Sequence, residues 1–406
     1  MELSYPYVSG DSHLEIDSKN WIDRVPEKYR DQAPRVIRTE QGHDAWVVAG
    51  QKPRANASDL YGGKGREKWT PNGQRYEETP GTGPGSQRVR EQDMDGVSAE
   101  VLFPAQVAGP RLWRNIEDDD AYRAVVRAYN DWLAEDYCSE APQRLIGLGV
   151  LPWTNTDDCI AEMERCAKLG LRSIVLGTFP SGKGYPTPDD DRFWEAAIAM
   201  NMPVTVHVQL DRSGPRAGPL FIFPKSFEGS ASNEAGIVSQ VANDKFCRLG
   251  GINAVQLMFA GVFDRFPTLR LDFAETQSGW LGHFYEQADD RYERHYYWAE
   301  RLLGMKPLAR KPSEYLREHC YWGFQKDRAG VELRHFVGAD RLLWASDFPH
   351  QESWWPESKK VLEHNFEGVP ADETFKMVCG NVVEFFHLED CYQAWEAARE
   401  GATLSA

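Results

Sequence analysis

Short apolar runs alternate with longer helical patterns along this chain of 406 residues, and the alternation predicts an α/β protein folded as a (β/α)8 TIM barrel. Two observations favour the barrel over an open doubly wound sheet. No G-x-G-x-x-G motif follows an early strand, which argues against a dinucleotide-binding sheet. Ligand-type side chains also recur at the predicted carboxyl ends of strands, where barrel enzymes place their chemistry.

The eight strands are predicted from runs of apolar and β-branched residues. The first covers Tyr5 to Val8, and the other seven are Ala99–Phe103, Leu145–Leu151, Ser173–Gly177, Pro203–Val208, Leu269–Ala274, Cys320–Phe324 and Leu342–Ser346. Helical patterns between them cover Asp120–Tyr137, Asp157–Leu169, Asp189–Met200, Gly279–Leu303 and Pro356–Phe366. The acidic triplets beginning at Asp118 and Asp189 are interpreted as helix starts, because carboxylates favour a helix amino end.

One domain is predicted over residues 1–406, with a long insertion after the first strand at 19–90 and a helical tail at 388–406. The insertion is rich in Gly, Pro, Arg and Tyr and shows little periodicity. Segments of this length are often lids or binding loops, so the insertion could cover the site or a subunit contact, or be a disordered decoration. The tail predicts an amphipathic or frayed helix.

Composition restricts the class of protein. There are 62 acidic and 46 basic residues, and the net charge of -16 argues against a nucleic-acid or anionic-membrane partner. Seven cysteines without a C-x-x-C pair favour a reducing compartment. The amino terminus lacks the pattern of a signal peptide, and no uncharged apolar stretch could span a bilayer. We expect a cytoplasmic enzyme with a small-molecule substrate.

A polar trio, Asp11, His13 and Glu15, follows the first predicted strand. Strand periodicity points all three side chains to one face, which is how a metal site could begin. The same residues beside Gly10 also fit a turn with a surface histidine.

Three further strands end in residues of the same chemical types. The fifth ends in His207, within an apolar run where an unpaired imidazole would be costly. The sixth ends in Glu275, and the eighth leads into Asp347 and His350. The alternatives are a hydrogen-bonded core histidine for His207 and an ion-paired carboxylate for Glu275. A set of oxygen and nitrogen ligands suited to Zn²⁺, Mn²⁺ or Fe²⁺ can be drawn from these strand ends: Asp11, His13, His207 and Asp347.

These motifs resemble the amidohydrolase superfamily, specifically the amidohydrolase-2 branch that contains aminocarboxymuconate semialdehyde decarboxylase and the resorcylate-type decarboxylases. The resemblance is carried by Asp11-Ser12-His13, His207, residues 262–275, residues 344–350 and the segment Asn381 to Phe386. It implies a distorted β/α barrel with a divalent metal held by Asp11, His13, His207 and Asp347. The chain departs from the family in two ways: it has D-x-H where many members have H-x-H or E-x-H, and Glu275 where the decarboxylase has a catalytic histidine.

Three functions follow from this set of residues. The leading hypothesis is a metal-dependent hydrolase or decarboxylase of a small carboxylated or cyclic, aromatic-derived metabolite. Its metal is zinc, with manganese or iron as alternatives; Glu275 or Asp347 transfers the proton, and His350 orients the substrate. In the second hypothesis Glu15, Glu275 and His350 add a second ion, which makes a dinuclear iron or manganese monooxygenase. The third is an inactive partner subunit.

Less is predicted about recognition and assembly. Arg291, Trp322 and His319 are candidates for the pocket lining, with structural roles as the alternative. The loops at 50–90 and 211–235 match no motif, so the substrate stays open. The resemblance implies a homodimer or larger homo-oligomer, and a hetero-oligomer is also open.

Overall fold

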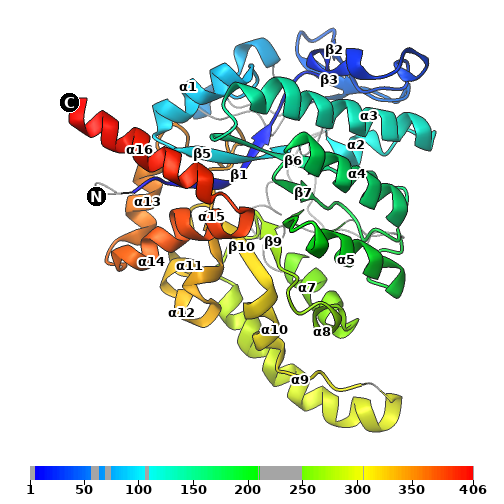
Figure 1. Ribbon diagram of the computed structural model, residues 1–406, viewed down its shortest axis with the longest axis vertical. Coiled ribbons are helices and arrows are strands. Elements are labelled where there is room, and N and C mark those ends of the chain that lie inside the picture. The colour runs from blue at the N-terminus through cyan, green and yellow to red at the C-terminus, as the bar shows by residue number, and fades with distance from the viewer. Residues whose placement is uncertain are drawn as a thin grey trace, which may run out of the picture.

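The computed structural model describes residues 5–55, 64–68, 75–105, 109–208, 210, 249–304 and 306–405. Its centre is a sheet of eight parallel strands in the order β1-β5-β6-β7-β8-β9-β10-β11, surrounded by helices (Figure 1). The strands are β1 Val8–Leu14, β5 Ala99–Pro104, β6 Leu145–Val150, β7 Ser173–Val175, β8 Val204–His207, β9 Leu271–Ala274, β10 Cys320–Phe324 and β11 Leu342–Trp344. The predicted barrel is confirmed. Seven strands match the sequence prediction closely because buried parallel strands are apolar runs.

The first strand was predicted wrongly. It begins at Val8 rather than at Tyr5, and it contains the polar motif instead of ending before it. All seven residues of β1 are buried. Polar residues are stable there because they have partners: the Ser12 hydroxyl lies 3.0 Å from the hydroxyls of both Ser9 and Ser346. A local apolar run could not predict this, since Ser346 lies at the other end of the chain.

The first and last strands close the barrel beyond the end of β11. The amide of Asp347 donates to the Asp11 carbonyl at 3.0 Å, and the amide of His13 donates to the Phe348 carbonyl at 2.8 Å. The buried guanidinium of Arg88 also donates to the carbonyls of His13 and Phe348. The seam between β1 and β11 is therefore held by backbone and side-chain hydrogen bonds where the predicted ligands lie.

The helices cover the outside of the barrel, and the long α9 extends away from it (Figure 1). Their bounds are α1 Gly85–Asp95, α2 Pro110–Trp113, α3 Asp119–Trp132, α4 Thr156–Leu169, α5 Asp191–Ala199, α7 Leu249–Phe259, α8 Val262–Arg265, α9 Leu281–Leu303, α10 Pro312–His319, α11 Arg328–Glu332, α12 Arg334–Val337, α13 Ser358–Phe366, α14 Ala371–Phe375, α15 Asn381–Phe386 and α16 Glu389–Ser405. Asp118 caps α3 by accepting from the amides of Asp120 and Ala121, as predicted for a helix start.

The described part of the region predicted as an insertion contains regular structure. Strands β2 Arg35–Arg38, β3 Asp44–Val47 and β4 Arg54–Ala55 form a small antiparallel sheet at the edge of the molecule (Figure 1). Helix α1 begins at Gly85, inside the predicted 19–90 boundary, and leads into β5. The loop predicted at 211–235 lies outside the described residues. No helix in the described ranges is long and apolar enough to cross a membrane.

Candidate metal centre and substrate pocket

The barrel brings the predicted ligands from distant parts of the chain to one place. Asp11 and His13 lie on β1, His207 is the last residue of β8, and Asp347 follows β11. The shortest contact joins the Nε2 atoms of His13 and His207 at 3.0 Å. Carboxylate oxygens of Asp11 and Asp347 each lie 3.3 Å from Nε2 of His13. Glu275, directly after β9, places Oε2 3.3 Å from Nε2 of His207.

Two overlapping groups of ligand atoms lie within 4.8 Å of one another among the described residues. One is Asp11, His13 and His207, and the other is His13, Asp347 and His350. Glu275 belongs to neither group, although it contacts His207. The four residues predicted to hold one metal ion therefore lie close together, around His13: Asp11, His13, His207 and Asp347.

The hydrogen bonding of His13 and Asp11 fits a cation. Nδ1 of His13 lies 3.1 Å from the Pro104 carbonyl, which can only accept, so Nδ1 carries the proton and Nε2 presents its lone pair to the cluster. Both carboxylate oxygens of Asp11 are buried and accept no hydrogen bond from a described residue. Buried carboxylates without donors are costly unless a positive charge lies beside them.

The electrostatics of the two aspartates differ. Burial raises the pKa of the Asp11 carboxyl well above its ordinary value, and the negative charges of Asp347 and Glu275 raise it further. Burial acts in the same direction on Asp347, but the nearby His350 and His13 outweigh it and hold the pKa of Asp347 below its usual range. A divalent ion between the carboxylates would favour the charged form of Asp11 as well.

Glu15 reaches the cluster through His350. The His350 ring stacks on the His13 ring, with centroids 3.9 Å apart. Nδ1 of His350 lies 3.1 Å from Asp347, and Nε2 lies 3.2 Å from Oε1 of Glu15. The Glu15 carboxylate belongs to neither group of ligand atoms and lies behind His350, which it can orient.

Three residues at strand ends around the cluster adopt left-handed backbone angles. Val208 has φ 59°, Glu275 φ 56° and Asp347 φ 55°. Such angles cost about 1–3 kcal/mol for residues other than glycine and collect at functional sites. For Val208 the β-branched side chain makes the position especially unfavourable. Because three separate strand ends adopt these unfavourable angles, the surrounding structure must hold the backbone there, and this fixes where the side chains lie.

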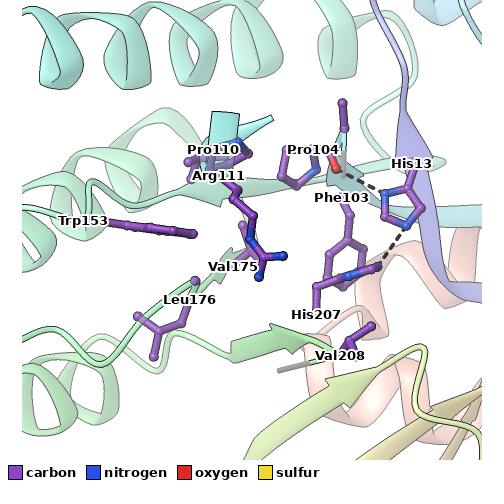
Figure 2. Close-up of a pocket in the computed structure, with 13 residues that line it drawn as sticks. His13, Phe103, Pro104, Pro110, Arg111, Trp153, Val175, Leu176, His207 and Val208 are labelled. Carbon is purple, nitrogen blue, oxygen red and sulfur yellow. Dashed lines mark hydrogen bonds between the residues drawn. The ribbon is translucent and has the colours of Figure 1, made fainter. Parts of the chain in front are cut away.

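A cavity of about 200 Å³ opens beside the histidine pair (Figure 2). Its walls are mainly apolar, with Phe103, Val150, Val175 and Leu176 among them. Arg111 and Trp153 also line it, and both were missed in the sequence analysis. Arg111 lies in α2, the first helix after β5, and Trp153 lies directly after β6, so a survey of charged and aromatic residues after every strand would have found them.

The three residues predicted as further pocket lining lie elsewhere. Trp322 is in the core, where its indole donates to Tyr285 and stacks on Phe273. His319 is the last residue of α10, directly before β10 and away from the carboxyl ends of the strands, and its Nδ1 contacts the carbonyl of Leu269. Arg291 lines a different cavity, beside α7 and α9. None of the three lines the cavity at the histidine pair.

The family model for amidohydrolases matches residues 82–388. The chain belongs to the amidohydrolase family. This confirms the resemblance to the amidohydrolase-2 branch on which the ligand set was predicted.

Named relatives of this amidohydrolase are decarboxylases. It is 25% identical over 291 residues to gamma-resorcylate decarboxylase of Polaromonas sp., covering 68% of this chain and 81% of the relative. It is 24% identical over 390 residues to 2-amino-3-carboxymuconate-6-semialdehyde decarboxylase of Dictyostelium discoideum, covering 93% and 91% of the two chains. A solved dihydroxybenzoic acid decarboxylase from Polaromonas, with bound manganese and 2-nitroresorcinol, has the same fold. That structure has a TM-score of 0.60 and 19% identity, covering 95% of this chain and 97% of the other.

Proposed function

We propose that this amidohydrolase is a divalent-metal-dependent decarboxylase that acts on an aromatic carboxylate. The proposal rests on one observation: a pair of histidines flanked by buried carboxylates faces a cavity with mainly apolar walls. Such a site combines a place for a cation with a place for a ring. The decarboxylases named above support the choice of reaction.

In this proposal Asp11, His13, His207 and Asp347 hold the ion. When bound there, a divalent ion would supply positive charge that stabilises the negative charge developing on the substrate. Two histidines with two carboxylates suit Mn²⁺ and Zn²⁺ alike. Zinc was the first expectation, while manganese is the ion bound in the solved Polaromonas decarboxylase.

The protein residues then handle the proton. The bond between the ring carbon and the carboxyl carbon breaks, carbon dioxide leaves, and the electron pair that stays on the ring carbon takes a proton. We assign the proton to Glu275, which contacts His207 at 3.3 Å but belongs to neither group of ligand atoms. His350 was expected to orient the substrate, but it does not line the cavity. We assign it instead to keeping Asp347 oriented, because it lies between Asp347 and Glu15.

The other functions considered from the sequence have weaker support. A hydrolase would use the same ligands, but the relatives above are named decarboxylases. A dinuclear oxygenase would draw on Glu15, Glu275 and His350. Of these, His350 belongs to one group of ligand atoms, whereas Glu15 and Glu275 belong to neither. A homo-oligomer stays a prediction.

The proposal is tested with protein loaded with Mn²⁺ or Zn²⁺ and a panel of hydroxybenzoates, by measuring carbon dioxide release and metal content. Glu275→Gln should keep its metal and lose turnover by at least about 100-fold, because general acid catalysis contributes that much. Glu332→Gln is the control, because Glu332 is an exposed carboxylate in α11 that pairs with Arg328. Unchanged turnover in Glu275→Gln would remove its assignment. Cleavage of amides or lactones without carbon dioxide release would refute the decarboxylase.

A further inference from the structure

We propose that Gly81 is a positioning residue for the metal centre, because the segment at residues 75–84 supports the turn that carries Asp347 and His350. This inference rests on the proposed function for the role of Asp347 as a metal ligand. It gives part of the region predicted as an insertion a task at the site. Its support comes from contacts within the turn, between the turn and Gly81, and between the segment and the small sheet.

The turn at residues 347–350 follows β11 and carries two side chains of the metal centre, Asp347 and His350. The His350 amide donates to the Asp347 carbonyl at 2.9 Å, so the two residues between them form the corner of a tight turn. One of these two residues is Pro349. Asp347 has φ 55°, an angle that its own backbone preference disfavours. The turn therefore depends on its surroundings, and a displacement of Pro349 would move the residues on either side of it.

Gly81 lies directly against Pro349. It has φ 79°, a backbone angle that other residues adopt only at a cost. A Cβ at residue 81 would lie 2.6 Å from Cβ and 2.7 Å from Cγ of Pro349, and 3.2 Å from the Phe348 ring. Both Pro349 atoms belong to a short ring that is closed onto the backbone, so they cannot move aside as a flexible side chain can. The close approach therefore requires glycine, and it ties the position of the turn to that of residue 81.

The segment around Gly81 is anchored, so it can serve as a fixed support. The Gly81 amide donates to Oε1 of Glu91 in α1 at 2.9 Å, and Glu91 is buried. Earlier in the segment, the Tyr76 amide donates to the Asp44 carboxylate of β3 at 2.9 Å. The Tyr76 hydroxyl accepts from the indole of Trp46, also in β3, at 2.5 Å. Helix α1 and the small sheet therefore both hold the segment that contacts the turn.

Other contacts hold the turn to β1 and α1. The Phe348 carbonyl accepts from the His13 amide at 2.8 Å and from the Arg88 guanidinium at 2.9 Å. A Cβ at 2.6 Å must reach about 3.4 Å for ordinary contact, so the turn or the segment would have to shift by about 0.8 Å. Ligand distances in a metal site vary by only about 0.2 Å. A methyl group at residue 81 should therefore displace Asp347 by more than a bound ion tolerates.

Calorimetric titration of the metal-free protein with Mn²⁺ tests the inference, with Gly81→Ala as the variant and Gly50→Ala as its matched control. Gly50 lies in the same region with φ 71°, but nothing in the described structure lies within 4 Å of a Cβ there. Both variants carry the same kind of backbone strain, and only Gly81→Ala pushes on the turn. Gly81→Ala should bind Mn²⁺ about 10- to 100-fold more weakly than the wild type, as is typical when the support of a metal ligand is altered. Gly50→Ala should bind it as tightly as the wild type.

Electron paramagnetic resonance of the bound Mn²⁺ distinguishes a positioning role from a general loss of stability. A displaced carboxylate changes the symmetry of the ligand field around the ion. The Mn²⁺ spectrum of Gly81→Ala should therefore differ in shape from that of the wild type, and the spectrum of Gly50→Ala should not. A variant that is only less stable would give the wild-type shape with a lower amplitude.

A second pair of variants decides the question if Gly81→Ala does not fold. Glu91→Gln retains a carbonyl oxygen that can accept from the Gly81 amide, whereas Glu91→Leu leaves this amide without its acceptor. Both variants remove the same charge, so a difference in their Mn²⁺ affinity reports the hydrogen bond. Glu91→Leu should bind Mn²⁺ about fivefold more weakly than Glu91→Gln, the factor that corresponds to one hydrogen bond.

Equal Mn²⁺ affinity and equal spectral shape in Gly81→Ala and Gly50→Ala would overturn the inference, because the contact with Pro349 would then have no influence on the ion. If Gly81→Ala does not fold, equal affinity in Glu91→Leu and Glu91→Gln would overturn it instead.

The measurements also separate the inference from the proposed function. If Mn²⁺ affinity depends on Gly81 but no hydroxybenzoate releases carbon dioxide, the decarboxylase fails and the inference stands. If hydroxybenzoates are decarboxylated and Gly81→Ala binds Mn²⁺ as tightly as Gly50→Ala, the inference fails and the decarboxylase stands. A wild type that binds neither Mn²⁺ nor Zn²⁺ would overturn both.

Discussion

Arg88 joins β1 to the segment after β11, which together carry three of the four proposed metal ligands, and its replacement by methionine should cost the protein much of its stability. The side chain is 0% exposed. Its guanidinium donates to Glu100 at 2.6 and 3.1 Å, to the His13 carbonyl at 3.1 Å and to the Phe348 carbonyl at 2.9 Å. It also lies 4.5 Å from the centre of the Phe348 ring.

The size of this loss is estimated from the groups that lose their partner in Arg88→Met, namely the Glu100 carboxylate and two backbone carbonyls. Glu100 is 3% exposed, and without Arg88 its carboxylate keeps a hydrogen bond from the Gln92 amide at 2.8 Å. Breaking one side of a buried ion pair costs about 3–5 kcal/mol. Each backbone carbonyl left without a donor would add about 1–3 kcal/mol if it stayed dry, and these terms are not additive. We expect a loss of about 4 kcal/mol in the free energy of unfolding.

Urea unfolding followed by tryptophan fluorescence measures this loss, with two further variants for comparison. Arg144→Met is the matched control, because Arg144 also donates to two backbone carbonyls and one carboxylate but is 25% exposed. Its cost should be about 1 kcal/mol. The double variant Arg88→Met/Glu100→Met should be more stable than Arg88→Met alone, because no uncompensated charge remains.

Two outcomes would refute this reasoning. One is an Arg88→Met variant that unfolds at the same urea concentration as the wild type. The other is a double variant that is destabilised by the sum of the two single costs, since the two side chains would then be acting independently.

Three other variants test separate features. His207→Ala should lose metal in elemental analysis while keeping the wild-type circular dichroism, and full metal occupancy would disprove His207 as a ligand. Burial raises the pKa of Asp95 to about 6, so the folded state binds a proton more tightly than the unfolded chain does. The protonated carboxyl therefore contributes to the free energy of unfolding at low pH, and this contribution is lost as the pH rises through about 6. Asp95→Asn keeps an acceptor for Ser358 but does not titrate. Its free energy of unfolding, measured with urea, should therefore rise relative to that of the wild type from pH 4 to 8, by up to about 3 kcal/mol. A difference that stays constant with pH would contradict the raised pKa of Asp95. Asp327 accepts from the amide and hydroxyl of Ser278 just beyond Glu275, so Asp327→Ala should destabilise the loop and speed its amide hydrogen exchange, whereas unchanged exchange would show that the loop is held otherwise.

Local sequence patterns predicted the strands well where a buried strand consists of a run of apolar residues. Seven of the eight barrel strands lie within a few residues of their predicted bounds, because parallel strands covered on both faces are apolar throughout. The first strand was misplaced because its buried polar residues are satisfied by partners such as Ser346, far along the chain. A pattern of neighbouring residues carries no information about such a partner.

The sequence by itself determined the barrel, the family and the ligand types at strand ends, since these depend on residue identity at positions that the strand periodicity defines. The tertiary structure alone decided which carboxylates meet. It placed Glu15 behind His350, brought Glu275 to His207, and put Arg111 and Trp153 on the cavity wall. The physical reason is that these contacts join residues up to several hundred positions apart, and only the closed barrel with its strained strand ends sets the distances between them.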